Sequence, residues 1–187
     1  MPGSEDSRAA PAYYDPAAQD ATMDPGRQFI GCLLQAPLHI ARRALAGMNS
    51  SDADDQMTSF VLQLVIELVA DDVPPAPAAV CEHARSTGRA GSETRQTRLR
   101  TWVFDTFQAA VVPQMAWYFK TILLEKAWRR AVAEHATRLS QAARSSPVDV
   151  LAGLLDNPHL AMLYQRYRAA ADTSGELDSR AASVAAA

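Results

Sequence analysis

The sequence has little of what most catalytic and metal-binding sites require. Only two cysteines occur among its 187 residues, Cys32 and Cys81, and they stand far apart. The four histidines are equally scattered, so no metal-ligand spacing is present, and we expect neither a metal nor another cofactor. Isolated thiols inside apolar helical patterns are typical of small buried side chains in a reducing compartment.

A phosphate-binding loop for nucleotides is also absent. The P-loop pattern GxxxxGK[ST] places a lysine after a glycine, because backbone amides cradle the phosphates while the lysine neutralises them. The only lysines, Lys120 and Lys126, follow Phe119 and Glu125 instead. No HExxH motif, Ser/His/Asp order or pair of carboxylates stands in a context that would support catalysis. We therefore expect that the protein is not an enzyme and does not hydrolyse ATP.

Long apolar stretches are missing as well. The uninterrupted apolar segments fall far short of the roughly 20 residues that a membrane-spanning helix needs. The first residues are acidic and contain no apolar segment of the kind found in secretory signals. Together these absences predict a cytoplasmic protein with no membrane partner.

Charge is divided unevenly along the chain, although the net charge is only −3. Residues 1–84 carry four basic and twelve acidic side chains, whereas residues 85–144 carry eleven basic and four acidic ones. The basic middle segment is a candidate for anion or partner contacts, and the alternative is a solvated helix face. The candidate residues are Arg95, Arg98, Arg100, Arg129 and Arg130. With this net charge, we expect direct DNA binding to be weak or absent.

Apolar residues recur at helical spacing along most of the chain, and no segment alternates convincingly like a strand. This pattern predicts an all-α protein with a small helical bundle as its head, followed by a long antiparallel helical hairpin. In the head, we expect Phe60 and Leu64 to be buried against Phe29 and Leu33. From Pro113 onwards about thirty residues lack Gly and Pro, which predicts one helix far longer than the average of about 11–12 residues.

Four regions follow from these patterns. Residues 1–22 are rich in Ala, Pro, Ser and Asp without periodicity, so we expect a disordered arm. The predicted helical head covers residues 23–112. Residues 113–171 are predicted to hold the hairpin and a C-terminal helix, with the antiparallel pair itself formed by residues 113–155. The small and polar residues 172–187 are predicted to be a disordered tail.

The long helix carries more large apolar side chains than one return helix can cover. We therefore predict that the hairpin also mediates self-association, since uncovered apolar surface of this kind marks a contact with another chain. The candidate residues are Trp117, Phe119, Ile122, Leu123, Trp128, Leu151 and Leu154. The alternative is that all of them pack internally against the head.

Several strings, in this order and spacing, resemble the N-terminal domain of DnaB-type bacterial replicative DNA helicases. Residues 27–35 are similar to the opening helix of that domain, and residues 61–88 to its third helix, proline turn and short fourth helix. Pro113 and the residues up to Ala127 resemble the start of its hairpin. The chain departs from the family at Asp72, where a glycine is usual.

The resemblance implies a helical head and a hairpin that pairs between subunits. In the family, the paired domains build a collar on the helicase ring, and the collar receives the helicase-binding domain of primase. The expected function is therefore a non-catalytic interaction and oligomerisation module in DNA replication, whose partners are a second copy and primase or replicative helicase. The alternatives are a dimeric helical regulator that binds DNA through its arginines, and an all-helical enzyme with an unrecognised pocket.

Overall fold

A computed structural model describes the backbone of residues 23–185 and the side chains of residues 23–174. The elements of this part of the chain are α2 (Pro25–Gln35), α3 (Leu38–Leu45), η1 (Ser50–Asp52), α4 (Gln56–Ala70), α5 (Pro77–Ser86), α6 (Glu93–Ala109), η2 (Pro113–Met115), α7 (Ala116–Ser145), α8 (Val148–Leu155) and α9 (Pro158–Ala185). All of them are helical, so the predicted all-α class is confirmed. The arm predicted for residues 1–22 lies outside the described residues.

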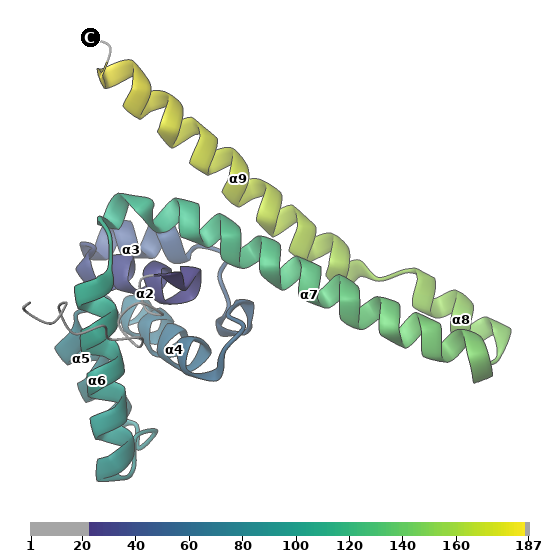
Figure 1. Cartoon of the computed structure of the whole chain (residues 1–187), viewed down its shortest axis with the longest axis horizontal. Coiled ribbons are helices and arrows are strands. Elements are labelled where there is room, and N and C mark those ends of the chain that lie inside the picture. Colours follow the sequence, from purple (N-terminus) through teal and green to yellow (C-terminus); the bar gives the residue numbers. More distant parts are fainter. Residues whose placement is uncertain (1–22, 186–187) are drawn as a thin grey trace, which may run out of the picture.

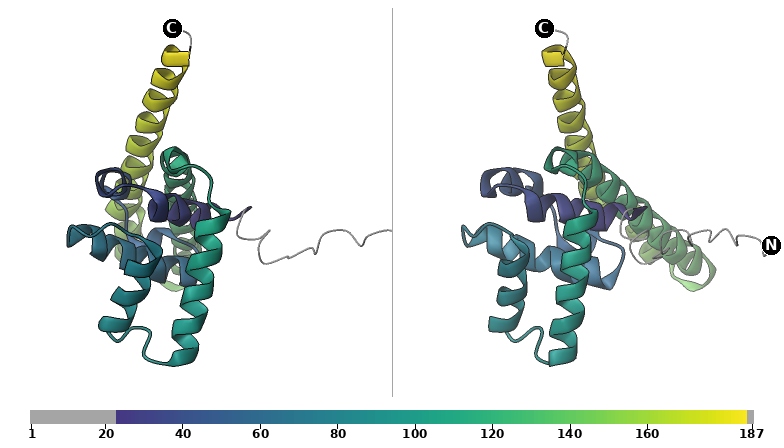
Figure 2. Two further views of the ribbon diagram at one scale, coloured as in Figure 1. Left: turned by 90° about the vertical axis from the view of Figure 1, so that its left-hand side faces the viewer. Right: turned by 60° about the vertical axis from the view of Figure 1, so that its left-hand side comes forward.

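The helices form a head from which a long hairpin projects (Figure 1). In the head, α2 lies at the centre and contacts α3, α4, α6 and α7. Helices α5 and α6 pack side by side at one end of the head (Figure 2). Helix α7 begins on the head and continues well beyond it, and α8 forms the tip of the hairpin.

Helix α2 is a core helix because its sequence is apolar or small on almost every face. The Asp24 carboxylate caps its first turn by accepting hydrogen bonds from the amides of Gly26 at 2.7 Å and Arg27 at 3.4 Å. Phe29 and Leu33 are fully buried, as the sequence predicts.

Helix α4 buries one broad stripe against this centre. Leu64 is fully buried, and that prediction is confirmed. Phe60 packs against the core but is only half-buried, so its predicted burial is confirmed only in part. The buried stripe runs through Thr58, Val61 and Val65, which leaves Phe60 on its flank because successive helical residues are turned by about 100°.

Gly31 marks the closest approach of α2 to the end of α6. A Cβ atom at this position would lie 2.5 Å from the Cβ of Ala110 and 2.7 Å from the carbonyl oxygen of Thr106. Gly153 on α8 is the opposite case, since a Cβ there would meet nothing within 4 Å. The two glycines therefore form a matched pair, one crowded and one open.

Gly31→Ala is expected to lower the free energy of unfolding by about 1–3 kcal/mol, because the added methyl forces the two helices apart. Gly153→Ala should instead raise the free energy of unfolding by about 0.5–1 kcal/mol, because alanine has a higher helix propensity than glycine. Urea unfolding of both variants, followed by circular dichroism, measures the two effects. Equal changes in the two variants would contradict the close packing of α2 on α6.

The return arm of the hairpin is α9, and the prediction that residues 113–155 contain the whole antiparallel pair is wrong. Helix α9 makes the most extensive contact with α7, and its Leu163 and Ala170 are buried. The helical conformation is interrupted between α8 and α9 at Asn157. The side-chain oxygen of Asn157 accepts hydrogen bonds from the amides of His159 and Leu160. This cap starts a new helix directly behind the short α8.

The predicted disordered tail is also wrong as far as Ala185. Helix α9 continues through this region and projects past the head in both figures. Once α9 has been nucleated, each further residue adds a backbone hydrogen bond, so the helix can continue into this polar segment. Residues 186–187 lie outside the described part.

Candidate functional site

The first half of α7 packs on the head. Three of the residues proposed for self-association therefore pack, wholly or in part, against the core of the same chain. Leu123 is 3% exposed and belongs to the hydrophobic core. Trp117 and Phe119 are partly buried and pack against the same core. The physical reason is that α7 crosses α2 and α3: Leu123 lies in the stripe of α7 that is buried, and Trp117 and Phe119 lie on its two flanks. Leu123 is therefore corrected from an interface candidate to a core residue.

Further along the hairpin, the other candidates are half-buried. Trp128 lies against Tyr164 of α9, with 5.4 Å between their ring centroids. Ile122 keeps part of its side chain exposed, as do Leu151 and Leu154 on α8. These four residues can still border a contact with a second chain, but each already has neighbours in its own.

The most exposed apolar residues of the hairpin are at its tip. We define the tip surface as Val148, Val150, Leu151, Leu154 and Leu155, all on α8. Val148 is 80% exposed and Leu155 is 71% exposed, and none of the eight residues of α8 is buried. Val148 and Leu155 are not among the residues predicted for self-association, although the apolar string 148–155 before the Asn-Pro pair is a usable signal.

A second exposed apolar group lies on the head. It comprises Phe104 on α6, Val111 and Val112 in the connection, Met115 in η2 and Tyr118 at the start of α7. Phe104 is 56% exposed. No property of the sequence separated these residues from core positions, because their spacing also fits a buried helix face.

The five arginines proposed for anion or partner contacts divide into three sets. Arg95, Arg98 and Arg100 are exposed on α6. Arg129 forms an exposed ion pair of 2.7 Å with Glu125, one turn away on the same helix. Arg130 reaches from α7 to the head, where its guanidinium donates hydrogen bonds to backbone carbonyl oxygens. These carbonyls belong to Ser51, Asp52 and Ala53, at 2.9, 3.3 and 3.4 Å.

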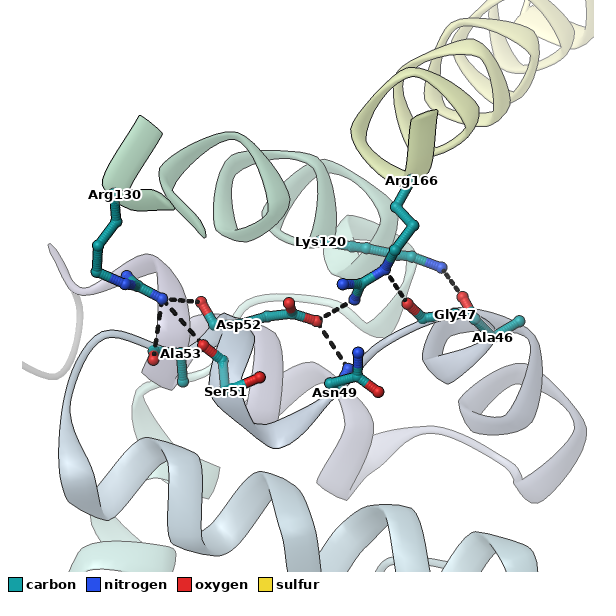
Figure 3. A network of polar contacts seen from close by, with 9 residues as sticks. All are labelled: Ala46, Gly47, Asn49, Ser51, Asp52, Ala53, Lys120, Arg130 and Arg166. Carbon is teal, nitrogen blue, oxygen red and sulfur yellow. Dashed lines mark hydrogen bonds and ion pairs between the residues drawn. The ribbon is translucent and has the colours of Figure 1, made fainter. Parts of the chain in front are cut away.

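A polar cluster joins the hairpin to the head (Figure 3). We call the segment of residues 46–53, between α3 and α4, the junction loop. The Lys120 ammonium donates a hydrogen bond of 2.6 Å to the carbonyl of Ala46, and the Arg166 Nε donates one of 2.8 Å to the carbonyl of Gly47. Figure 3 shows both side chains reaching from α7 and α9 to this loop. The hairpin is thus held on the head by charge-assisted hydrogen bonds as well as by apolar packing.

Asp52 is the acidic member of this cluster. It is 3% exposed, forms an ion pair with Arg166, and accepts a hydrogen bond of 2.7 Å from the amide of Asn49. Lys120 is 8% exposed. One buried carboxylate therefore faces two buried or nearly buried cations.

The imbalance is reflected in the titration of Lys120. Burial, reinforced by repulsion from Arg166, lowers the pKa of Lys120 from 10.5 to about 8, although attraction to Asp52 opposes the change. The folded chain thus gives up the Lys120 proton more readily than the unfolded chain does.

Stability is accordingly expected to rise between about pH 8 and pH 10.5 through Lys120. In this window the unfolded chain holds the Lys120 proton and the folded chain has lost it, so a higher pH favours the folded state. The measurement is the unfolding free energy of the wild type and of Lys120→Met at several pH values. The free energy of unfolding of the wild type minus that of the variant should increase with pH. A difference that stays constant over this pH range would contradict the lowered pKa.

Glu67 also has a strongly shifted pKa, and its contacts join α4 to α5. Burial alone would raise the pKa of Glu67, but hydrogen bonds from Gln63, His83 and Arg89 lower it to about 2. His83 Nε2 and Arg89 Nη2 each lie 2.8 Å from a Glu67 oxygen. Every polar group here has a protein partner, so the cluster is a structural link between helices.

The described residues place their polar clusters between helices and loops of the same chain. Among them, no three His, Cys, Asp or Glu side chains come together as a metal site, and no helix has the length and apolar character to cross a bilayer. Comparisons of the chain with protein-family models, with curated proteins and with solved structures find no match.

Proposed function

We propose that this chain is a non-catalytic interaction and oligomerisation module that acts as a scaffold or regulator in DNA replication. The observation that carries the proposal is the tip surface of the hairpin. Its residues are apolar on most faces of α8, and the described part of the chain buries none of them. The first partner that we propose is a second copy of this chain.

The energetic argument concerns leucine and valine side chains that remain in water. Burying such a side chain fully contributes about 1.5–3 kcal/mol relative to leaving it exposed. Several of them on one short helix make an exposed apolar patch, which in small proteins usually marks an interaction site. Pairing of two tips, or of a tip with another copy's α7, would remove Val148, Val150 and Leu155 from water.

The order of elements supports the replication part of the proposal. The described chain has a helical head followed by a long hairpin, which is the arrangement that the resemblance to the helicase N-terminal domain implies. Asp72 stands where that family usually has glycine, and its φ of 63° lies in the left-handed region that glycine prefers. On this proposal, primase or a replicative helicase is the further partner.

A second candidate function is direct DNA binding by α6. Arg95, Arg98 and Arg100 are exposed on that helix, and phosphate contacts by such residues need no base-specific geometry. Binding of this kind weakens steeply with salt, by about 10³–10⁵ between 50 and 200 mM when six to ten contacts are made. Tight, sequence-selective binding at physiological salt would favour this candidate over the oligomerisation module.

Leu155→Glu and Val150→Glu are the variants that test the proposed function. Each places a charge in the contact between copies, so self-association should weaken by roughly 30- to 700-fold, the equivalent of about 2–4 kcal/mol. Helicity should be unchanged, because neither residue is packed in the core. Analytical ultracentrifugation gives the association constant, and circular dichroism gives the helicity.

Phe104→Glu is the matched control, since Phe104 is also exposed but lies on the head. It should leave the association constant within about twofold of the wild type. If Phe104→Glu abolishes dimers while both tip variants preserve them, the head is the contact surface and the tip is not. A titration with the helicase-binding domain of primase then tests the partner part separately from self-association.

A further inference from the structure

A cavity of about 260 Å³ lies where α3, α7 and α9 meet, next to the junction loop. Three cationic side chains line it: Arg43 from α3, Lys120 from α7 and Arg166 from α9. The remaining walls are mostly apolar, with the Trp117 ring and Leu124 among them. We call this space the junction cavity.

The positive charge around the junction cavity exceeds the negative charge. Arg43, Lys120 and Arg166 bring three cations, and the carboxylate paired with them is that of Asp52. Asp52 itself is almost fully buried and already engages Arg166. Two positive charges are therefore left without a counter-charge in the described part of the chain.

Hydrogen-bond donors are also in surplus here. An ammonium has three donors and a guanidinium has five. Among the described residues, the Lys120 ammonium donates to the Ala46 carbonyl, and Arg166 uses its Nε and one terminal nitrogen. The Arg43 guanidinium lies over the Trp117 ring, with 5.7 Å from its carbon to the ring centroid, and its side chain donates no hydrogen bond to another described residue. Each of the three side chains thus keeps donors that a bound anion can use.

We propose that the junction cavity binds a small phosphate-bearing anion, either inorganic phosphate or a small phosphate monoester. A dianion matches the surplus of two positive charges, and phosphate oxygens accept from both guanidinium and ammonium groups. The size of the cavity limits the ligand, because pockets for drug-sized molecules run to about 300–1,000 Å³. The Trp117 ring provides an apolar wall for the organic part of a monoester.

The titration of Lys120 provides an independent signal of binding. Its pKa of about 8 reflects burial together with repulsion from Arg166. A dianion in the cavity would restore the protonated form, so binding near pH 8 should take up a proton. Because the ligand touches both α3 of the head and α9 of the hairpin, it would also tie the two parts together. This inference is independent of the self-association proposed above.

The test uses inorganic phosphate and phenyl phosphate as separate probes in isothermal titration calorimetry on the full chain. Arg43→Ala is the informative variant, because Arg43 is exposed and its loss should not affect folding. Arg42→Ala is the matched control, since Arg42 is its neighbour on α3 but pairs with Asp72 away from the cavity. Circular dichroism verifies that both variants keep their helicity.

We expect at least one probe to bind the wild type with a dissociation constant below about 1 mM. Arg43→Ala should weaken this binding about ten- to hundredfold, because a charge-assisted hydrogen bond is lost, whereas Arg42→Ala should change it less than about twofold. Titration at pH 8 in buffers of different ionisation enthalpy should reveal proton uptake. Tighter binding of phenyl phosphate than of phosphate would identify a monoester as the ligand, and the reverse order would identify the free ion.

Two results would overturn the proposal. One is the absence of binding by both probes at millimolar concentration. The other is equal binding by the wild type and Arg43→Ala, since the anion would then sit elsewhere.

Discussion

Replacement of Asp52 by alanine is expected to lower the free energy of unfolding by about 3–5 kcal/mol, the range for removing one partner of a buried ion pair. Asp52 is 3% exposed and is the carboxylate that faces Arg166 and Lys120. Without it, two cations remain at the junction with no counter-charge. The Asn49 amide, which donates to Asp52 at 2.7 Å, also loses its partner.

Asp54→Ala provides the control for this effect. Asp54 lies two residues away and pairs with Lys126 at 3.6 Å, but both side chains are about half exposed. An exposed pair of this kind contributes only about 0–1 kcal/mol, so the loss should be correspondingly small. Urea unfolding at neutral pH measures both variants. A small loss for Asp52→Ala, comparable to that of Asp54→Ala, would mean that the junction cluster does not hold the hairpin on the head.

The second large effect is expected for Leu64→Ala, which should lower the free energy of unfolding by about 2–5 kcal/mol. Leu64 is fully buried on α4, and α4 packs on the central helix α2. Truncation removes apolar contacts and leaves a cavity that the surrounding helices can close only in part.

The same substitution at an exposed leucine isolates the contribution of burial. Leu155→Ala removes the same atoms from a side chain that is 71% exposed, and it should cost less than about 0.5 kcal/mol. Thermal unfolding at low protein concentration keeps any self-association out of the comparison. A loss at Leu64 below about half a kcal/mol would contradict the packing of α4 on α2.

The helices of the head could be predicted from the sequence because their boundaries are local. Asp24 and Pro25 start α2, and Pro77 starts α5, each through a rule that involves only a few neighbouring residues. The single long helix after Pro113 followed in the same way from the absence of Gly and Pro. The burial of Phe29 and Leu64 followed from helical periodicity.

The pairing of helices could not be predicted, because it depends on contacts between distant residues. The aromatic excess on α7 indicated a partner, but Tyr164, which covers Trp128, is 36 positions further along. A second copy and the chain's own α9 would produce the same sequence pattern. The sequence therefore favours the nearest apolar string as the return arm, and in the structure this string forms the short helix α8.

The junction cluster was missed for a similar reason. Arg166 and Asp52 are separated by 114 positions, and Lys120 and Ala46 by 74. A basic residue on a long helix has the same appearance in the sequence whether it faces solvent or a backbone carbonyl. Arg130, which was proposed for partner contacts, is the clearest example, because its guanidinium binds three carbonyls of its own chain.

The most direct test of the central claim is the mass of the wild-type protein by multi-angle light scattering, from low to high micromolar concentration. The proposed function predicts a mass that rises to that of two chains or more, with helicity unchanged over the series. A mass that stays at that of one chain throughout the range would contradict self-association through the hairpin, and with it the proposed parallel to the helicase collar.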